Sequence, residues 1–247
     1  MNILSFSPII LILLAIITFL LTKKIFQALG VILIILLLSS FVTGFLIYND
    51  VQDFKEQFAT EEKLFLLTQE EIGKENEYFA GFTMESNELG ILLDDDKIKD
   101  YKLKTNKEIL NNNYKLLLFS KDSFDNLKRF YINDIEFKKI EFLEVIESEN
   151  SLKDAARLMD LSKDEFKTMF DVKDDSETRS LFFGIMVSEA IEQDSQFLIR
   201  NIKEKTIKVY PETILFKLIK FIPESVFNNI LKGMDITKKV KKYNVIL

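Results

Sequence analysis

Two clusters of carboxylates are the residues of this chain best suited to chemistry. Residues 94–96 are three consecutive aspartates, and residues 171–177 contain three aspartates and one glutamate. Carboxylate oxygens bind hard cations such as Mg²⁺ or Ca²⁺ and serve as general acids or bases. The second cluster lacks the glycine and spacing of a calcium-binding loop, and Lys97 and Lys173 compete for the carboxylates. We therefore interpret both clusters as solvated segments beside helix starts, and expect no metal site, cofactor site or catalytic residue.

The lack of histidine and cysteine narrows the chemistry further. Without imidazole there is no Ser-His-Asp triad, no histidine-ligated zinc and no side chain whose unperturbed pKa lies near neutrality. Without thiols there are no disulfides, thiolate metal sites or cysteine nucleophiles. The chain also contains no glycine-rich phosphate loop and no Gly-x-Ser-x-Gly motif. These absences favour a protein that acts by binding, with a hydrolase or transferase that uses carboxylates as the enzymatic alternative.

Residues 151–170 carry the most recognisable motif. Ser151 is suited to cap a helix that presents the small Ala156, Asp160 begins a polar turn, and Phe166 follows on a second helix. This pattern loosely resembles a helix-turn-helix. A glycine is favoured where Asp160 stands, and the second helix mixes lysines with acids, so it offers phosphates little net attraction. We expect no nucleic-acid partner and keep a membrane-tethered regulator with this hairpin as a third hypothesis.

The elements that position these residues begin with two apolar runs, 3–22 and 25–48, joined by two lysines. Apart from those lysines, the first 49 residues carry no charge. At about 1.5 Å of rise per residue, each run is long enough for a hydrocarbon core of roughly 30 Å. We predict a transmembrane helical hairpin over 1–48, with the lipid bilayer as its partner. A cleaved signal peptide or a re-entrant first run is the alternative.

Lys23 and Lys24 determine the predicted topology. Basic residues close to a span favour the cytoplasmic side, and neither outer flank of the hairpin is basic. The turn is therefore expected in the cytoplasm and the soluble domain outside it, in a multi-pass cell-membrane protein. Ser40 and Gly44 lie four residues apart in the second span, a spacing that permits close helix contact and self-association.

The rest of the chain has the composition of a folded domain. Hydrophobic residues make up 47% of the sequence and aromatic residues 12%, most of them phenylalanine, which is enough apolar surface to offset the ordering entropy. We predict a helical stalk over 49–63, an α+β domain over 64–233 and a basic tail over 234–247. The fold class is thus a membrane-anchored α+β protein, and because no linker separates the two halves, they share one core.

Hydrophobic periodicity changes from that of strands to that of helices near residue 120. A small sheet is predicted at about 64–119, with strands at 64–67, 77–84, 89–93, 98–104 and 114–119. A helical half is predicted at about 122–233, with helices at 123–132, 135–146, 177–203 and 211–220 besides the pair within 151–170.

Residues 211–233 are apolar with flanking lysines. Phe216 and Phe221 stand beside Lys217 and Lys220, a pattern typical of a helix at a membrane interface and also of one that closes a domain core.

Charge is distributed unevenly along the chain. The net charge of −6 combines +2 in the first 48 residues, −15 in the middle and +7 from residue 200 onward. The basic end attracts either the acidic middle or anionic lipid head groups. The predicted role is a surface-anchored interaction or assembly module with an unknown protein partner.

Overall fold

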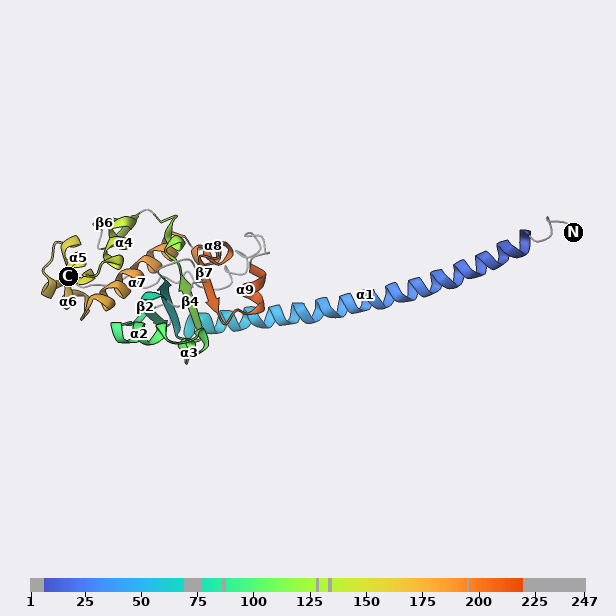
Figure 1. Cartoon of the computed structure of the whole chain (residues 1–247), viewed down its shortest axis with the longest axis horizontal. Helices are drawn as coiled ribbons and strands as arrows, with labels where there is room; N and C mark the ends of the chain where they lie inside the picture. Colours follow the sequence, from blue (N-terminus) through green and yellow to red (C-terminus); the bar gives the residue numbers. More distant parts are fainter. Residues whose placement is uncertain are drawn as a thin grey trace. The chain divides into compact units, whose positions relative to one another are not determined.

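The computed structural model describes residues 7–68, 77–85, 88–127, 129–132, 135–194 and 196–219. The chain forms two compact units, Met1–Asn49 and Asp50–Leu247. In the first unit the described residues belong to helix α1 (Ser7–Thr60), which has 54 residues and continues into the second unit. The second unit is an α+β domain with a mixed five-stranded sheet (Figure 1).

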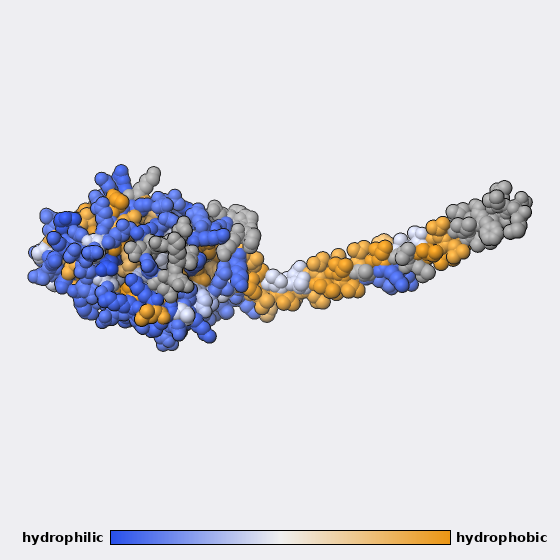
Figure 2. Space-filling view, in the orientation of Figure 1, coloured by the Kyte–Doolittle hydropathy of each residue, from blue (hydrophilic) through white to orange (hydrophobic). Residues whose placement is uncertain are grey.

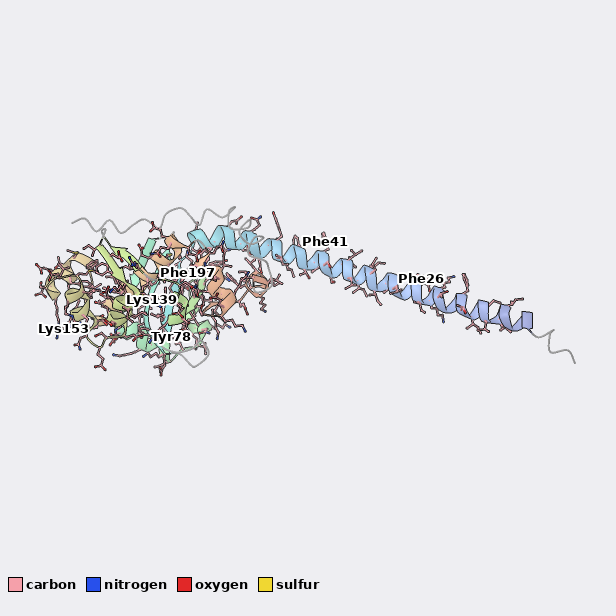
Figure 3. The ribbon with its side chains drawn as sticks, turned by 90° about the horizontal axis from the view of Figure 1, so that it is seen from above. Phe26, Phe41, Tyr78, Lys139, Lys153 and Phe197 are labelled. Carbon is pink, nitrogen blue, oxygen red and sulfur yellow. The ribbon has the colours of Figure 1, made fainter. Side chains whose placement is uncertain are left out.

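Helix α1 has the length and apolar surface of a membrane helix. Its segment Ile12–Asp50 has 39 residues and is long and apolar enough to cross a bilayer, and none of its most apolar window is buried within the structure. Hydrophobic residues cover most of the described part of this helix in Figure 2, and Phe26 and Phe41 project from it in Figure 3, 71% and 76% exposed. A surface this apolar is costly in water and stable in lipid.

The predicted helical hairpin over 1–48 is not confirmed. Lys23 and Lys24, where the turn was expected, are helical and exposed within α1. Lysine is a good helix former, and no glycine, proline or asparagine stands between the two apolar runs to end the helix. The local sequence therefore favours continuation of the helix at this point.

The five-stranded sheet has the strand order β3-β2-β1-β4-β7. The central β1 pairs antiparallel with β2 and parallel with β4, while the edge strands β3 and β7 pair antiparallel with their neighbours. Two further strands, β5 and β6, form a separate antiparallel ribbon. The strands are β1 (Lys63–Thr68), β2 (Tyr78–Glu85), β3 (Glu88–Leu92), β4 (Lys115–Phe119), β5 (Arg129–Ile132), β6 (Ile135–Lys138) and β7 (Ile207–Tyr210).

Helices cover both faces of the sheet. Alternate residues of β1 point to opposite faces, so that Phe65 lies in a large core with α7 and Leu64 lies in a smaller core with α2 and α3. In the large core the ring of Phe183 meets that of Phe119 edge-on at 5.4 Å. The helices of the domain are α2 (Asp95–Lys102), α3 (Asn106–Leu110), α4 (Lys139–Glu147), α5 (Ser151–Leu158), α6 (Lys163–Phe170), α7 (Asp175–Gln193), α8 (Phe197–Glu204) and α9 (Ile214–Ile219), with a 3-10 helix η2 (Lys121–Phe124).

Four of the five predicted strands are present, but the strand predicted at 98–104 is wrong. Helix α2 occupies much of that range, because Asp94 caps it by accepting a hydrogen bond from the backbone nitrogen of Lys97 at 2.8 Å. Acids in the first turn and lysines in the last turn favour the helix further, including the Asp95–Lys99 ion pair at 3.1 Å.

The helix predicted at 123–132 is wrong, and the helix predicted at 135–146 is present only from Lys139 onward, as α4. Residues 129–132 and 135–138 are the strands β5 and β6, which pair so that Phe130 lies opposite Phe137, and α4 begins only at Lys139. Each strand has four residues, a length too short for its period to be separated from that of a helix.

The long helix predicted at 177–203 is interrupted at Asp194. The backbone of Asp194 is extended, and its carboxylate accepts hydrogen bonds from the backbone nitrogen of Gln196 and from the guanidinium of Arg200. These contacts separate α7 from α8. The strand β7, which the sequence analysis missed, then adds to the edge of β4.

The residues predicted to form a stalk are part of the domain. Residues 50–60 of α1 are helical as predicted, and Phe58 is buried against the large core.

The C-terminal elements are described in part. Helix α9 lies within the helix predicted at 211–220 but begins at Ile214. The basic tail at 234–247 lies outside the described residues.

Candidate functional site

A pocket of about 190 Å³ lies where five separate parts of the domain chain meet. Its walls come from Phe79 of β2, Lys102 of α2, Lys121 of η2, Arg179 of α7 and residues 146–149 at the end of α4. Ile146 and Phe79 contribute apolar surface to the lining, and the charged lining residues are Lys102, Lys121, Glu147, Glu149 and Arg179. Small-molecule sites commonly combine apolar surface with polar groups that orient the ligand.

One wall of the pocket is already neutralised by an ion pair. The Nζ atom of Lys121 lies 2.6 Å from Oε1 of Glu147, and it also lies 5.7 Å from the centroid of the Phe79 ring. The lysine is thus held by a carboxylate on one side and an aromatic face on the other. This pair leaves Lys102, Glu149 and Arg179 as the pocket charges that have no ion-pair partner among the described residues.

Arg179 is held in place by hydroxyl groups rather than by a carboxylate. Its Nε atom donates a hydrogen bond to Oγ of Ser151 at 3.2 Å, and that hydroxyl donates in turn to the carbonyl oxygen of Ser148 at 2.8 Å. Ser151 is fully buried. The guanidinium is therefore oriented at the pocket, and no carboxylate of the described residues forms an ion pair with it.

The helix that carries Arg179 is fixed to the sheet by its neighbour, Ser180. The buried Oγ atom of Ser180 accepts a hydrogen bond from the nitrogen of Gly81 at 3.1 Å and donates one to the carbonyl oxygen of Leu93 at 3.0 Å. A Cβ atom on Gly81 would lie 2.9 Å from the carbonyl oxygen of Phe65, so this close approach requires glycine. The first turns of α7 are thus set at a defined distance from β2.

Two buried lysines form a second charged cluster, at the start of the parallel strands β1 and β4. Lys63 and Lys115 are register partners, 0% and 2% exposed. The Nζ atom of Lys63 donates to the carbonyl oxygens of Phe58 and Glu61, both at 2.7 Å. The Nζ atom of Lys115 donates to the carbonyl oxygen of Pro211 at 3.1 Å.

The surroundings of Lys115 join three elements of the domain. Its Nζ atom lies 5.0 Å from the centroid of the Tyr114 ring and 5.5 Å from that of Phe216. Burial lowers the pKa of Lys115, while the carboxylates of Asp50 and Asp53 act in the opposite direction. Burial raises the pKa of Tyr114 to about 12, and the same two carboxylates add to this shift.

These buried groups form a structural junction. Oδ2 of Asp50 accepts a hydrogen bond from the nitrogen of Leu215 at 3.1 Å, so the end of α1 is tied to the start of α9. Since Lys63 and Lys115 are buried and bonded to carbonyl groups, they are not open to a ligand.

No protein family model, no curated protein and no solved structure matches the chain. Its function is therefore argued from its own residues.

The carboxylate clusters singled out in the sequence act as helix caps. Asp94 caps α2, Asp174 caps α7 through the nitrogen of Glu177 at 2.8 Å, and Asp175 accepts a hydrogen bond from the nitrogen of Leu152. Within the part of the chain that the structure describes, no group of three such side chains is arranged to hold a metal ion.

The predicted membrane-interface residues are divided by the structure. Phe216 is 3% exposed and packs in the large core, so it is not at a surface as that prediction required, whereas Lys217 is exposed. Lys220 and Phe221 lie outside the described residues. In the first unit, Ser40 and Gly44 are exposed on α1, and a Cβ atom at Gly44 would meet open space.

The predicted helical pair at 151–170 is present as α5 and α6. Asp160 adopts the left-handed conformation that the turn requires, with φ at 55°, and Phe166 is buried. Residues 139–194, which include both helices, contain seven lysines and arginines and fifteen acids, a net charge of −8. A net charge of this sign over the two helices and their neighbours disfavours binding to the extended phosphate backbone of nucleic acid.

Sequence reasoning did not single out the residues of the pocket. Phe79, Lys102, Lys121 and Arg179 are spread over 100 residues and share no spacing. One signal was available: the chain has four arginines against 29 lysines, so each arginine is a rare choice in this composition.

Proposed function

We propose that the chain is a membrane-anchored binding module, an interaction or assembly protein whose domain lies outside the cytoplasm. The observation that carries this proposal is the exposed apolar segment Ile12–Asp50, joined directly to a closed, phenylalanine-rich domain. The carboxylates that an enzyme of this composition would use serve instead as helix caps. The domain therefore has the features of a binding protein held at a membrane.

The length of α1 favours two spans. The 39 residues of Ile12–Asp50 measure roughly 58 Å as one helix, about twice the 30 Å of a hydrocarbon core. A break at Lys23 and Lys24 yields runs of about 30 Å and 36 Å, over 3–22 and 25–48, and places both lysines at the membrane surface. We infer that in a bilayer this mismatch in length outweighs the local preference for a continuous helix, so that the helix breaks at Lys23 and Lys24 with the turn in the cytoplasm.

The polar side chains within α1 suit a lipid environment. Oγ1 of Thr18 donates to the carbonyl oxygen of Leu14 at 2.7 Å, and Oγ1 of Thr43 donates to that of Ser39 at 2.8 Å. Hydroxyl groups bonded to the backbone of their own helix enter a bilayer without an unsatisfied polar atom.

Labelling of single cysteines tests this topology, because the natural chain has none. Two variants report on the two ends: Asn2→Cys precedes the first run, and Leu103→Cys replaces a side chain that is 89% exposed on the domain. A membrane-impermeant maleimide applied to intact cells is expected to label both. Leu36→Cys, in the middle of the second run, is the matched control and is expected to remain unlabelled.

Each other outcome contradicts one part of the proposal. Labelling of Leu103→Cys without Asn2→Cys contradicts the two-span hairpin; the mass of the mature protein then separates a cleaved first run from one that remains in the cytoplasm. Labelling of Leu103→Cys only after permeabilisation of the cells places the domain in the cytoplasm and overturns the proposed orientation.

A further inference from the structure

We propose that the pocket between α2, α4 and α7 binds a small organic anion, whose carboxylate or phosphate group lies between Arg179 and Lys102. The inference deepens the proposed function, on which it rests for the view that the domain acts by binding. It assigns a ligand class to this pocket.

The arginines of the chain give the first argument. Three of the four pair with carboxylates: Arg129 with Glu136 at 2.7 Å, Arg157 with Asp154 at 3.1 Å, and Arg200 with Asp194. The fourth, Arg179, has no carboxylate partner among the described residues, although it is partly buried. Partly buried arginine is usually paired, since its charge is costly to remove from water. The missing partner is supplied by an anionic ligand.

The orientation of Arg179 gives the second argument. Its Nε atom is held by Ser151, which is itself held by the carbonyl oxygen of Ser148. The terminal nitrogens of the guanidinium remain for a ligand, and their planar fork suits the two oxygens of a carboxylate or phosphate. A side chain held in one orientation loses less freedom when a ligand binds.

The balance of charge in the pocket gives the third argument. The Lys121–Glu147 pair is internally neutral. Of the remaining lining charges, Lys102 and Arg179 are positive and Glu149 is negative, which leaves one net positive charge. An anion is therefore the ligand that neutralises the pocket, while Phe79 and Ile146 provide an apolar surface for its organic part.

The volume of the pocket suits a small ligand. A space of about 190 Å³ is comparable to the engineered apolar cavity of about 150 Å³ that binds benzene. A small organic acid or a phosphate head group matches this size.

The test uses the full-length protein in detergent micelles, at constant ionic strength to hold charge screening fixed. Its thermal unfolding midpoint is measured against increasing benzoate, inorganic phosphate and, as the uncharged control, benzamide. Saturable stabilisation by benzoate or by phosphate is expected, because a ligand that binds the folded state raises the midpoint. Benzoate alone identifies a carboxylate ligand and phosphate alone a phosphate ligand. Stabilisation by neither anion, or equal stabilisation by benzamide, overturns the proposal.

Substitutions test whether the stabilising anion binds in the pocket. Arg179→Gln is expected to weaken binding of the active anion at least tenfold, whereas Arg157→Gln, which removes a mostly exposed arginine from α5, leaves it unchanged. Lys102→Gln replaces an exposed side chain and is expected to weaken binding of the anion about threefold. Because an exposed side chain can be replaced without loss of the fold, this variant keeps the test decisive if Arg179→Gln fails to fold. Equal affinity in Lys102→Gln and the natural protein would contradict the assignment. Because these measurements use purified protein, their outcome is independent of membrane topology.

Discussion

Ser176 and Ser180 lie one turn apart on α7, and replacing each with alanine has opposite expected effects. Both side chains are buried. Oγ of Ser180 bonds the nitrogen of Gly81 and the carbonyl oxygen of Leu93, whereas Oγ of Ser176 has no hydrogen-bond partner within the described ranges. The same chemical change thus removes two hydrogen bonds at one site and an unsatisfied hydroxyl at the other.

The magnitudes follow from these contacts. Ser180→Ala leaves the nitrogen of Gly81 buried without its partner, which is expected to cost about 2 to 3 kcal/mol. Ser176→Ala is expected to stabilise the domain by about 0.5 to 1 kcal/mol, through relief of the buried hydroxyl and the higher helix propensity of alanine. For a domain of this size each kcal/mol shifts the unfolding midpoint by about 2 to 4 °C. The two variants should therefore unfold about 5 to 15 °C apart.

Thermal unfolding of the full-length protein in detergent measures this difference. Near-ultraviolet circular dichroism is the suitable signal, because it reports on packed aromatic rings, which are concentrated in the domain core. Ser188→Ala, at a half-exposed position on the same helix, is the control for helix propensity and should unfold within about 2 °C above the natural protein. If Ser176→Ala and Ser180→Ala unfold within about 2 °C of each other, the hydroxyl of Ser180 does not hold α7 to the sheet.

Two further predictions concern the anchor and the junction at Lys115. Gly44→Cys should form disulfide-linked dimers in oxidised membranes, because its open face permits close helix contact. Leu38→Cys is the control and should not form them. Equal yields of dimer from the two variants would refute self-association through this face. In an alkaline titration followed at 295 nm, one tyrosine should ionise near pH 12, and Tyr114→Phe should remove that step. Since the native pKa of Tyr114 is raised from 10.0, the free energy of unfolding that it contributes is complete below pH 10 and is lost as the pH rises toward 12. If the loss of stability between pH 10 and pH 12 is the same in Tyr114→Phe and the natural protein, this reasoning is contradicted.

Several elements could be predicted because the cause of each lies in a short stretch of sequence. The strands at 64–67 and 114–119 are short apolar runs bounded by polar residues, and both are buried on two faces. The helices α5 and α6 carry their own signals, including the reciprocal hydrogen bonds between Ser162 and Glu165. In these cases local preference and tertiary packing agree.

Other elements depend on contacts that no local pattern reveals. The strand β7 has four residues and is stabilised by pairing with β4, which lies about 90 residues earlier in the chain. The ribbon of β5 and β6 similarly overrode a helical pattern. The sequence left Phe216 open to a membrane surface or to the domain core, because it shows the apolar neighbours of Phe216 but not the buried Lys115 over its ring.

Composition alone establishes that an apolar segment, charged only at Lys23 and Lys24, precedes a phenylalanine-rich domain, and that the chain carries no imidazole and no thiol. These properties depend on composition and on hydration of individual side chains, so they need no fold. Which of the charges are matched depends on the folded chain. Three arginines pair with carboxylates that lie within seven residues of them along the chain. Arg179 instead lies at a pocket assembled from five segments between residues 79 and 179, and chain folding alone brings those segments together.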